Sequence, residues 1–156
     1  MNLLLRQLFD HSSSTYTYII GSNDDALIID PVKENVSQYI NLLDELGLSL
    51  KMVLDTHVHA DHVTGSGLLQ KQKACEVGSP IESAACCGSF SFKDETILEL
   101  GALKFKCLST PGHTNDSYCF YFKNPGWIFT GDTLLIRRTG RTDFQNGSAD
   151  NLYESL

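Results

Sequence analysis

The stretch Thr56-His57-Val58-His59-Ala60-Asp61-His62 carries three histidines and an aspartate within six residues. Imidazole and carboxylate groups are the usual protein ligands of zinc and of non-haem iron. Side chains spaced this closely can converge on one point only where the backbone leaves regular structure, so a loop is expected here. A chance cluster of surface polar residues is a weak alternative, because only two of the five histidines lie elsewhere in the chain.

The residues before this histidine loop predict strands and a helix. Alternating residues over 14–20 and the apolar run 26–30 predict two strands that pair as a hairpin. Apolar residues then recur at helical spacing up to Gly47, which occupies the position of a C-terminal cap. Asn35, with a glutamine three residues later, predicts a capping box at the start of that helix. The short apolar run 50–54 predicts the strand that leads into the histidine loop.

Strand-like runs continue after the loop. A short polar-faced helix is expected over 68–73, followed by two strands within 96–108 on either side of Gly101. Two more strands are expected over 117–122 and 127–130. Strands outnumber helices, but a strand-helix-strand-loop-helix unit lies in the middle, so the predicted fold class is mixed α/β, or α+β.

Two further strand ends carry residues that can bind a metal. His113 follows one expected strand in the sequence Pro111-Gly112-His113, and Asp132 follows another in Thr130-Gly131-Asp132. Taken alone, His113 is equally well explained as a turn residue, and Asp132 is better explained as one. Because rigid strands hold side chains in place better than flexible loops do, the three strand ends together predict one metal site at one edge of a sheet.

Three of the four arginines, Arg137, Arg138 and Arg141, lie shortly after Asp132. Arginine binds carboxylates through two parallel hydrogen bonds, which favours an acidic substrate near the metal. The alternatives are a solvated surface or an internal ion pair between Arg141 and Asp143.

Composition limits the classes of protein to be considered. The chain has 156 residues, of which 42% are hydrophobic and 20% charged, and its formal net charge is −7. One domain over residues 1–156 is expected from this length. The acidic balance argues against a nucleic-acid partner or an anionic membrane surface.

No apolar run reaches the ~20 residues that span a bilayer, and the first residues lack the features of a targeting peptide. A cytoplasmic protein is therefore expected.

The five cysteines are Cys75, Cys86, Cys87, Cys107 and Cys119. Their number is odd and no two are spaced as CxxC, so reduced thiols in a reducing compartment are expected. A reactive thiol at Cys86 or Cys87 is the alternative.

The order of the HxHxDH motif at 57–62, then His113, then Asp132 resembles that of the metallo-β-lactamase superfamily. Residues 56–67 and 131–145 further resemble the persulfide dioxygenase (sulfur dioxygenase) branch. The resemblance implies an αββα sandwich, of which this chain forms the N-terminal part with an incomplete second half. No histidine follows His113 to complete a two-metal site, and the final residues read as the opening of a helix. We therefore expect the C-terminal portion to be missing.

The same resemblance implies one Fe(II) per chain, held by His57, His113 and Asp132. It further implies supporting roles around these ligands for His59, Asp61 and His62. Glutathione persulfide and O₂ would be the substrates, with Arg137, and less certainly Arg141, holding a glutathione carboxylate. The products would be sulfite and glutathione.

Two alternatives stay open at this point. A glyoxalase II-like hydrolase would use zinc to cleave a glutathione thioester, but that chemistry depends more on a second metal. An inactive fragment, or a homodimer that buries an exposed sheet face, is the non-enzymatic alternative.

Overall fold

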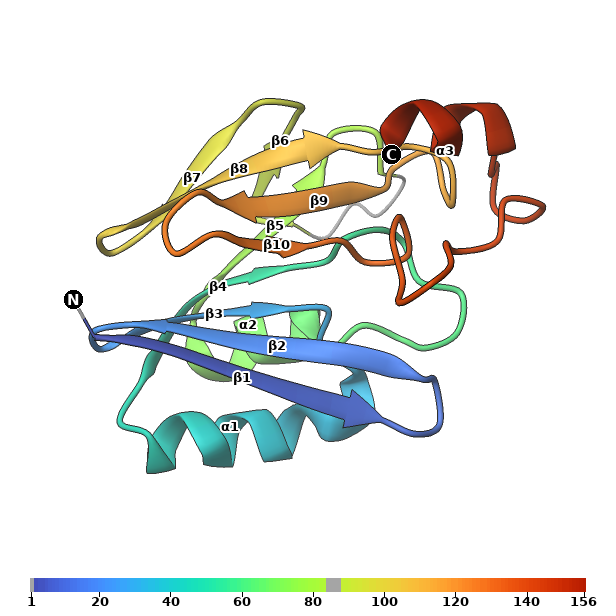
Figure 1. Ribbon diagram of the computed structural model, residues 1–156. Coiled ribbons are helices and arrows are strands. Elements are labelled where there is room, and N and C mark those ends of the chain that lie inside the picture. The colour runs from blue at the N-terminus through green and yellow to red at the C-terminus, as the bar shows by residue number, and fades with distance from the viewer. Residues whose placement is uncertain (1, 84–87) are drawn as a thin grey trace.

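The computed structural model describes residues 2–83 and 88–156. It consists of two packed β-sheets with helices against the larger one (Figure 1). The strands are β1 (Leu3–Asp10), β2 (Thr15–Ser22), β3 (Asp25–Ile29), β4 (Ser49–Leu54), β5 (Glu76–Pro80), β6 (Phe90–Phe92), β7 (Ile97–Leu100), β8 (Leu103–Ser109), β9 (Tyr118–Phe122) and β10 (Trp127–Phe129). The helices are α1 (Val36–Glu45), α2 (Ser66–Lys73) and α3 (Ala149–Ser155), and a 3-10 turn covers Lys33–Asn35. The expected mixed α/β class is confirmed.

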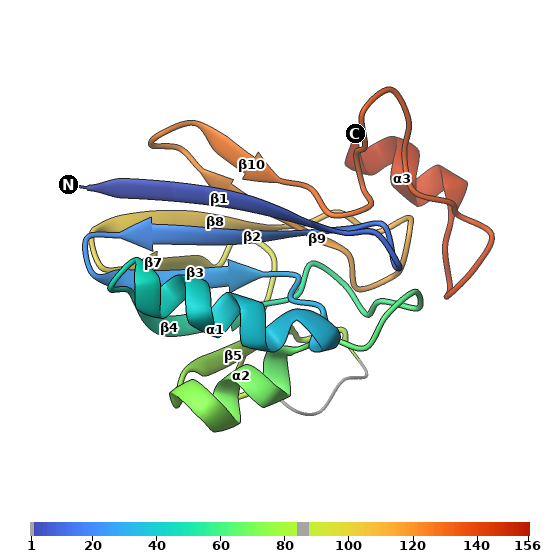
Figure 2. The same cartoon turned by 90° about the horizontal axis from the view of Figure 1, so that it is seen from below.

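The larger sheet has six strands in the order β1-β2-β3-β4-β5-β6, and the smaller has four in the order β10-β9-β8-β7. Neighbouring strands run antiparallel from β1 to β3 and parallel from β3 to β6. Parallel neighbours need a crossover connection, and α1 and α2 provide two of them. Figure 2 shows both helices lying across one face of the larger sheet.

The centre of the larger sheet is buried on both faces, which explains the continuous apolar runs at 26–29 in β3 and 52–54 in β4. In β2, Ile19 packs with residues of α1 and α2, whereas Ile20 packs with residues of the smaller sheet. Both isoleucines are fully buried. The layers are therefore helix, sheet and sheet, as expected for the N-terminal part of an αββα sandwich, and α3 lies beside one end of the smaller sheet (Figure 1).

The sequence pattern predicted β2, β3, β4 and β7 to β10, but not β5 and β6. Gly78 and Pro80 interrupt the apolar pattern of β5, and both residue types are depleted in strands. The structure explains the glycine. A Cβ atom at Gly78 would lie 2.5 Å from the Phe90 ring and 2.6 Å from a Leu54 methyl group, so only glycine lets β4, β5 and β6 pack this closely.

The two ends of α1 differ in how well they were predicted. Gly47, at a φ of +67°, ends the helix as expected, and the Leu48 amide donates back to the Leu43 carbonyl at 2.8 Å. The predicted capping box at the other end is wrong. Asn35 precedes the helix, but its side chain makes no capping bond and instead donates to Asp10 Oδ1 at 3.0 Å. A tertiary contact with the end of β1 has replaced the local one.

None of the helices in the described residues is both long and apolar enough to cross a membrane. Cys75, Cys107 and Cys119 are buried free thiols, as expected. Cys86 and Cys87 lie outside the described residues.

Candidate metal centre

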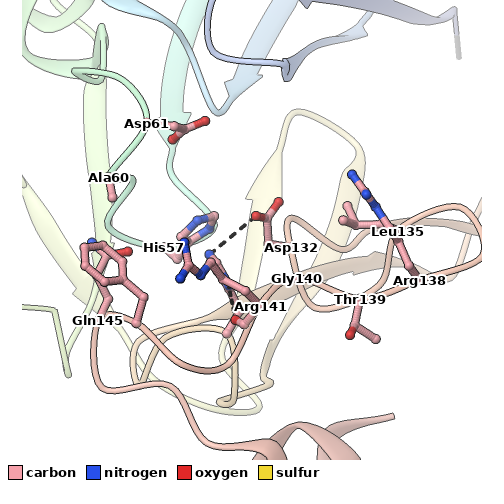
Figure 3. Close-up of a pocket in the computed structure, with 12 residues that line it drawn as sticks. His57, Ala60, Asp61, Asp132, Leu135, Arg138, Thr139, Gly140, Arg141 and Gln145 are labelled. Atoms are coloured by element: carbon pink, nitrogen blue, oxygen red, sulfur yellow. Dashed lines mark hydrogen bonds and ion pairs between the residues drawn. The ribbon is translucent and has the colours of Figure 1, made fainter.

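His57, His113 and Asp132 come together at one end of the two-sheet sandwich. One donor atom from each lies within 4.8 Å of the others. His113 Nε2 is 3.4 Å from Asp132 Oδ2, and the His57 and His113 rings stand nearly perpendicular with their centroids 4.9 Å apart. Figure 3 shows His57 and Asp132 on facing sides of this point. Residues 75 positions apart in the chain thus offer their donor atoms to one small volume.

The three strand ends belong to two sheets. His57 follows β4 of the larger sheet, whereas His113 and Asp132 follow β8 and β10 of the smaller one. The expectation that all three ligands lie at one edge of a single sheet is therefore wrong. Sheets packed face to face lie about 10 Å apart, so side chains from two facing edges can reach the same point between them.

Hydrogen bonds determine which ring nitrogen of each histidine is free. The main-chain oxygen of Arg141 can only accept, so His113 Nδ1 donates to it at 2.8 Å. Thr56 Oγ1 donates to Asp30 Oδ2 at 2.9 Å and therefore accepts from His57 Nδ1, also at 2.9 Å. Both imidazoles are left with Nε2 as the lone-pair nitrogen, which is how metal-binding histidines are commonly oriented.

The electrostatic surroundings keep His57 neutral. Burial, together with the neighbouring His59 cation, lowers the pKa of His57 to about 3. Only a neutral imidazole can donate its lone pair to a metal. His57 and His113 are both buried, so the donor set of two imidazoles and one carboxylate fits a metal ion.

His59 belongs to a different interaction. Its Nε2 donates to Asp30 Oδ1 at 3.1 Å. Burial opposes the charged form of His59, but the charge and hydrogen bond of Asp30 outweigh this and raise the pKa of His59 to about 9. His59 is therefore an imidazolium paired with a buried carboxylate. Its ring packs against the ring of His57, with the two ring centroids 4.1 Å apart.

Asp61 and His62 form a neighbouring group with Thr15, at the start of β2. Thr15 Oγ1 lies 3.1 Å from Asp61 Oδ2 and 3.2 Å from His62 Nδ1. His62 Nε2 is buried and has no hydrogen-bond partner in the described structure. Donor atoms of His59, Asp61 and His62 also lie within 4.8 Å of one another, but an ion held by all three would first have to displace the proton of the His59 cation.

The family resemblance implied supporting roles around the metal ligands for His59, Asp61 and His62, and such a role requires hydrogen bonds to those ligands. Among the described residues, the side-chain bonds to His57 and His113 come instead from Thr56 and from the main chain of Arg141. Neither partner was predicted. The choice of these partners depends on how the loops pack.

Asp30 is the other residue that the sequence analysis missed. It is 4% exposed, and its carboxylate accepts from the Thr56 amide at 2.6 Å as well as from the Thr56 hydroxyl and His59. The signal was present in Ile28-Ile29-Asp30-Pro31, since an acid that ends a fully apolar strand needs a buried partner.

A pocket of about 530 Å³ opens beside the candidate metal centre, and His57, His113 and Asp132 are among its lining residues (Figure 3). Arg141 also lines it, but its guanidinium bonds both carboxylate oxygens of Asp143, at 2.8 and 3.1 Å. The internal ion pair considered from the sequence is thus present. Arg137 is exposed and is not among the residues that line the pocket.

The two packed sheets and the histidine–aspartate cluster at their strand ends define an α/β sandwich protein with a candidate metal centre. The chain belongs to the metallo-beta-lactamase superfamily, which it matches over residues 13–85 and 91–156. Membership of this superfamily implies a metal.

Individual members of the superfamily resemble the chain to different degrees. The chain is 41% identical to the protein named persulfide dioxygenase ETHE1, mitochondrial, from Bos taurus, over 99% of this chain and 61% of that protein. It is 30% identical to a hydroxyacylglutathione hydrolase from Francisella tularensis subsp. novicida, over 97% of this chain and 60% of that protein. The crystal structure of ETHE1 from Myxococcus xanthus superposes with a TM-score of 0.93 at 45% identity, covering 97% of this chain and 67% of that one. The chain spans about three fifths of the length of the curated relatives it matches.

Proposed function

We propose that this chain carries the metal centre of an Fe(II)-dependent persulfide dioxygenase, with one ion per chain held by His57, His113 and Asp132. The observation that carries the proposal is the donor set of two imidazoles and one carboxylate whose donor atoms lie within 4.8 Å of one another. Two histidines and one carboxylate on one side of the ion are typical of non-haem Fe(II) oxygenases, because they leave coordination positions open. The persulfide dioxygenase name of relatives about 40% identical supports the same assignment.

The proposed reaction consumes glutathione persulfide, O₂ and water and yields sulfite and glutathione. Bound iron would supply the redox chemistry between oxygen and the terminal sulfur, while the protein supplies position and charge. Thr56 and the Arg141 carbonyl keep the two imidazoles in the required tautomer. Leu135 and Phe144 add apolar side chains to the lining of the pocket.

A glyoxalase II-like hydrolase is the second candidate, and one observation favours it. His59, Asp61 and His62 could hold a second ion if His59 lost its proton, and within the described part of the chain His62 Nε2 is buried without a partner. Zinc held by these residues would supply the hydrolytic chemistry that a glutathione thioester needs. The relative named hydroxyacylglutathione hydrolase is consistent with this chemistry. Against it, no histidine follows His113 in this chain.

One paired experiment separates the two functions. Metal per chain is counted by elemental analysis, and O₂ uptake with glutathione persulfide is measured beside hydrolysis of lactoylglutathione. The dioxygenase requires iron and O₂ uptake. Zinc with thioester turnover and no O₂ uptake would replace it with the hydrolase. A chain that retains no metal and elutes as an aggregate or obligate dimer on gel filtration would favour the inactive fragment.

The homodimer and the cytoplasmic location remain predictions. The mammalian relatives are named mitochondrial, so fractionation of the cells that produce this protein is the direct test of its compartment. Light scattering of the purified chain tests the dimer.

A further inference from the structure

We propose that Arg138 binds a carboxylate of the substrate and so sets the preference of this pocket for an acidic, glutathione-like sulfur compound. The inference rests on the proposed function for the identity of the substrate. It gives to Arg138 the role that the sequence resemblance gave to Arg137 and Arg141.

The backbone of residues 135–138 decides which arginine faces the pocket. Leu135 and Arg138 are paired as a β-bridge, and each amide donates to the other's carbonyl, at 2.8 and 3.3 Å. Directly opposed residues of such a pair extend on the same side of the ladder, and both Leu135 and Arg138 line the pocket. Ile136 and Arg137 form the tip of this turn, where Ile136 is 88% exposed and Arg137 has a φ of +64°.

Arg138 and Arg141, which both line the pocket, differ in their existing partners. The guanidinium of Arg141 is bonded to both oxygens of Asp143 and lies 5.5 Å from the centre of the Phe144 ring. The ion pairs of the described residues do not include Arg138. The planar Arg138 guanidinium can donate two parallel hydrogen bonds to a carboxylate. No carboxylate of the described residues accepts them, and Arg138 lines the same pocket as the candidate metal ligands.

The layout of the pocket suits a substrate that carries both a reactive sulfur and a carboxylate. Figure 3 shows Arg138 beside Leu135, on the opposite side of Asp132 from His57 in this view. A sulfur near His57 and Asp132 can therefore be linked along the pocket to a carboxylate at Arg138. The volume of about 530 Å³ is in the usual range for small-molecule sites. In a chain of net charge −7, a free cation at this rim is also what lets an anionic substrate approach.

The test measures binding and does not depend on turnover. S-methylglutathione and its dimethyl ester are titrated into the full chain by calorimetry. We expect the wild type to bind the acid about 10-fold more tightly than the ester, the order of effect of one charge-assisted hydrogen-bond pair at an exposed site. Arg138→Gln should abolish this preference, and Arg138→Lys should keep part of it as a point charge. Arg6→Gln, a charge-matched change in β1, should leave the preference intact.

Three results would overturn the inference. One is an Arg138→Gln variant that keeps the full preference for the acid. Another is a preference that disappears in Arg137→Gln or Arg141→Gln but persists in Arg138→Gln. The third is a wild type that binds acid and ester equally. Because the Arg138 side chain makes no hydrogen bond within the described residues, melting curves of Arg138→Gln should match the wild type and exclude misfolding as a cause.

The outcome is separable from that of the proposed function. A wild type that shows the Arg138-dependent preference but takes up no O₂ with glutathione persulfide refutes the dioxygenase and supports the carboxylate site. A wild type that takes up O₂ while Arg138→Gln binds both ligands like the wild type refutes only the carboxylate site.

Discussion

His113 Nδ1 donates a hydrogen bond of 2.8 Å to the main-chain oxygen of Arg141, so the loop that begins at Asp132 returns to fix the tautomer of His113. Gly140 makes this return possible. Its amide donates to the Asp132 carbonyl at 2.7 Å, and a Cβ atom there would lie 2.6 Å from that carbonyl oxygen and 2.8 Å from His113 Nδ1. One loop therefore positions two of the three candidate metal ligands.

Gly140→Ala should weaken both folding and metal retention. The added methyl group meets backbone and an imidazole that cannot move without disturbing the ligands, so we expect the free energy of unfolding to fall by about 1–3 kcal/mol. Urea denaturation and iron content after desalting measure the two effects. Gly67→Ala is the matched control, because a Cβ there meets nothing within 4 Å and alanine in a helix is favoured by roughly 0.5–1 kcal/mol. Equal iron content in the two variants would contradict the close packing at Gly140.

His113→Ala should abolish iron retention, because it removes one of the three proposed ligands. Among the described residues, the group around this point has no fourth member that could take its place. Elemental analysis of the protein purified under anaerobic conditions with Fe(II) is the measurement. His11→Ala provides the control, since His11 is exposed and contacts only the Phe9 ring among the described aromatic pairs. Equal iron occupancy in the two variants would remove His113 from the site.

Asp30→Asn should destabilise the fold by about 3 kcal/mol, because it leaves the buried charge of His59 without its partner. Asp30 has a φ of +52°, a conformation that asparagine also tolerates, so backbone strain does not contribute. The pKa of His59 should fall, since Asp30 is the first of the carboxylates that raise it, ahead of Asp55 and Asp61. Thermal unfolding and an NMR titration of the metal-free protein report the two effects. Asp24→Asn, at an exposed site, should change stability by no more than about 0.5 kcal/mol, and similar losses in both variants would be evidence against the pair.

Asp10 should make stability depend on pH in acid. Hydrogen bonds from the Ser13 amide, the Ser13 hydroxyl and Asn35 lower the pKa of Asp10 from 3.8 to about 2. The unfolded chain therefore takes up this proton first as the pH falls, so the stabilising contribution is present above pH 3.8 and is lost between pH 3.8 and about 2. Denaturation of Asp10→Asn across this range should show a shallower loss of stability than the wild type. Parallel curves for the two proteins would show that Asp10 titrates normally in the folded state.

Prediction from sequence succeeded where a feature is set by neighbours in the chain. The hairpin of β2 and β3, the helix α1 and its end at Gly47 follow from the spacing of apolar residues and from a glycine in a left-handed conformation. Prediction failed at β5, where Gly78 is required by the rings and methyl groups of other strands. The capping box at Asn35 failed for the same reason, since Asp10 lies 25 residues away.

The same division applies to the candidate site. By itself the sequence determined that histidines and acids end three strands, because those positions are local properties of each strand and its loop. Only the tertiary structure decided that the three ends come from two sheets, that Asp30 pairs with His59, and that Arg138 faces the pocket while Arg141 is bound to Asp143. The physical reason is that a side chain's partner depends on which surfaces the packed sheets bring within about 3 Å of one another, and residue spacing along the chain does not specify that distance.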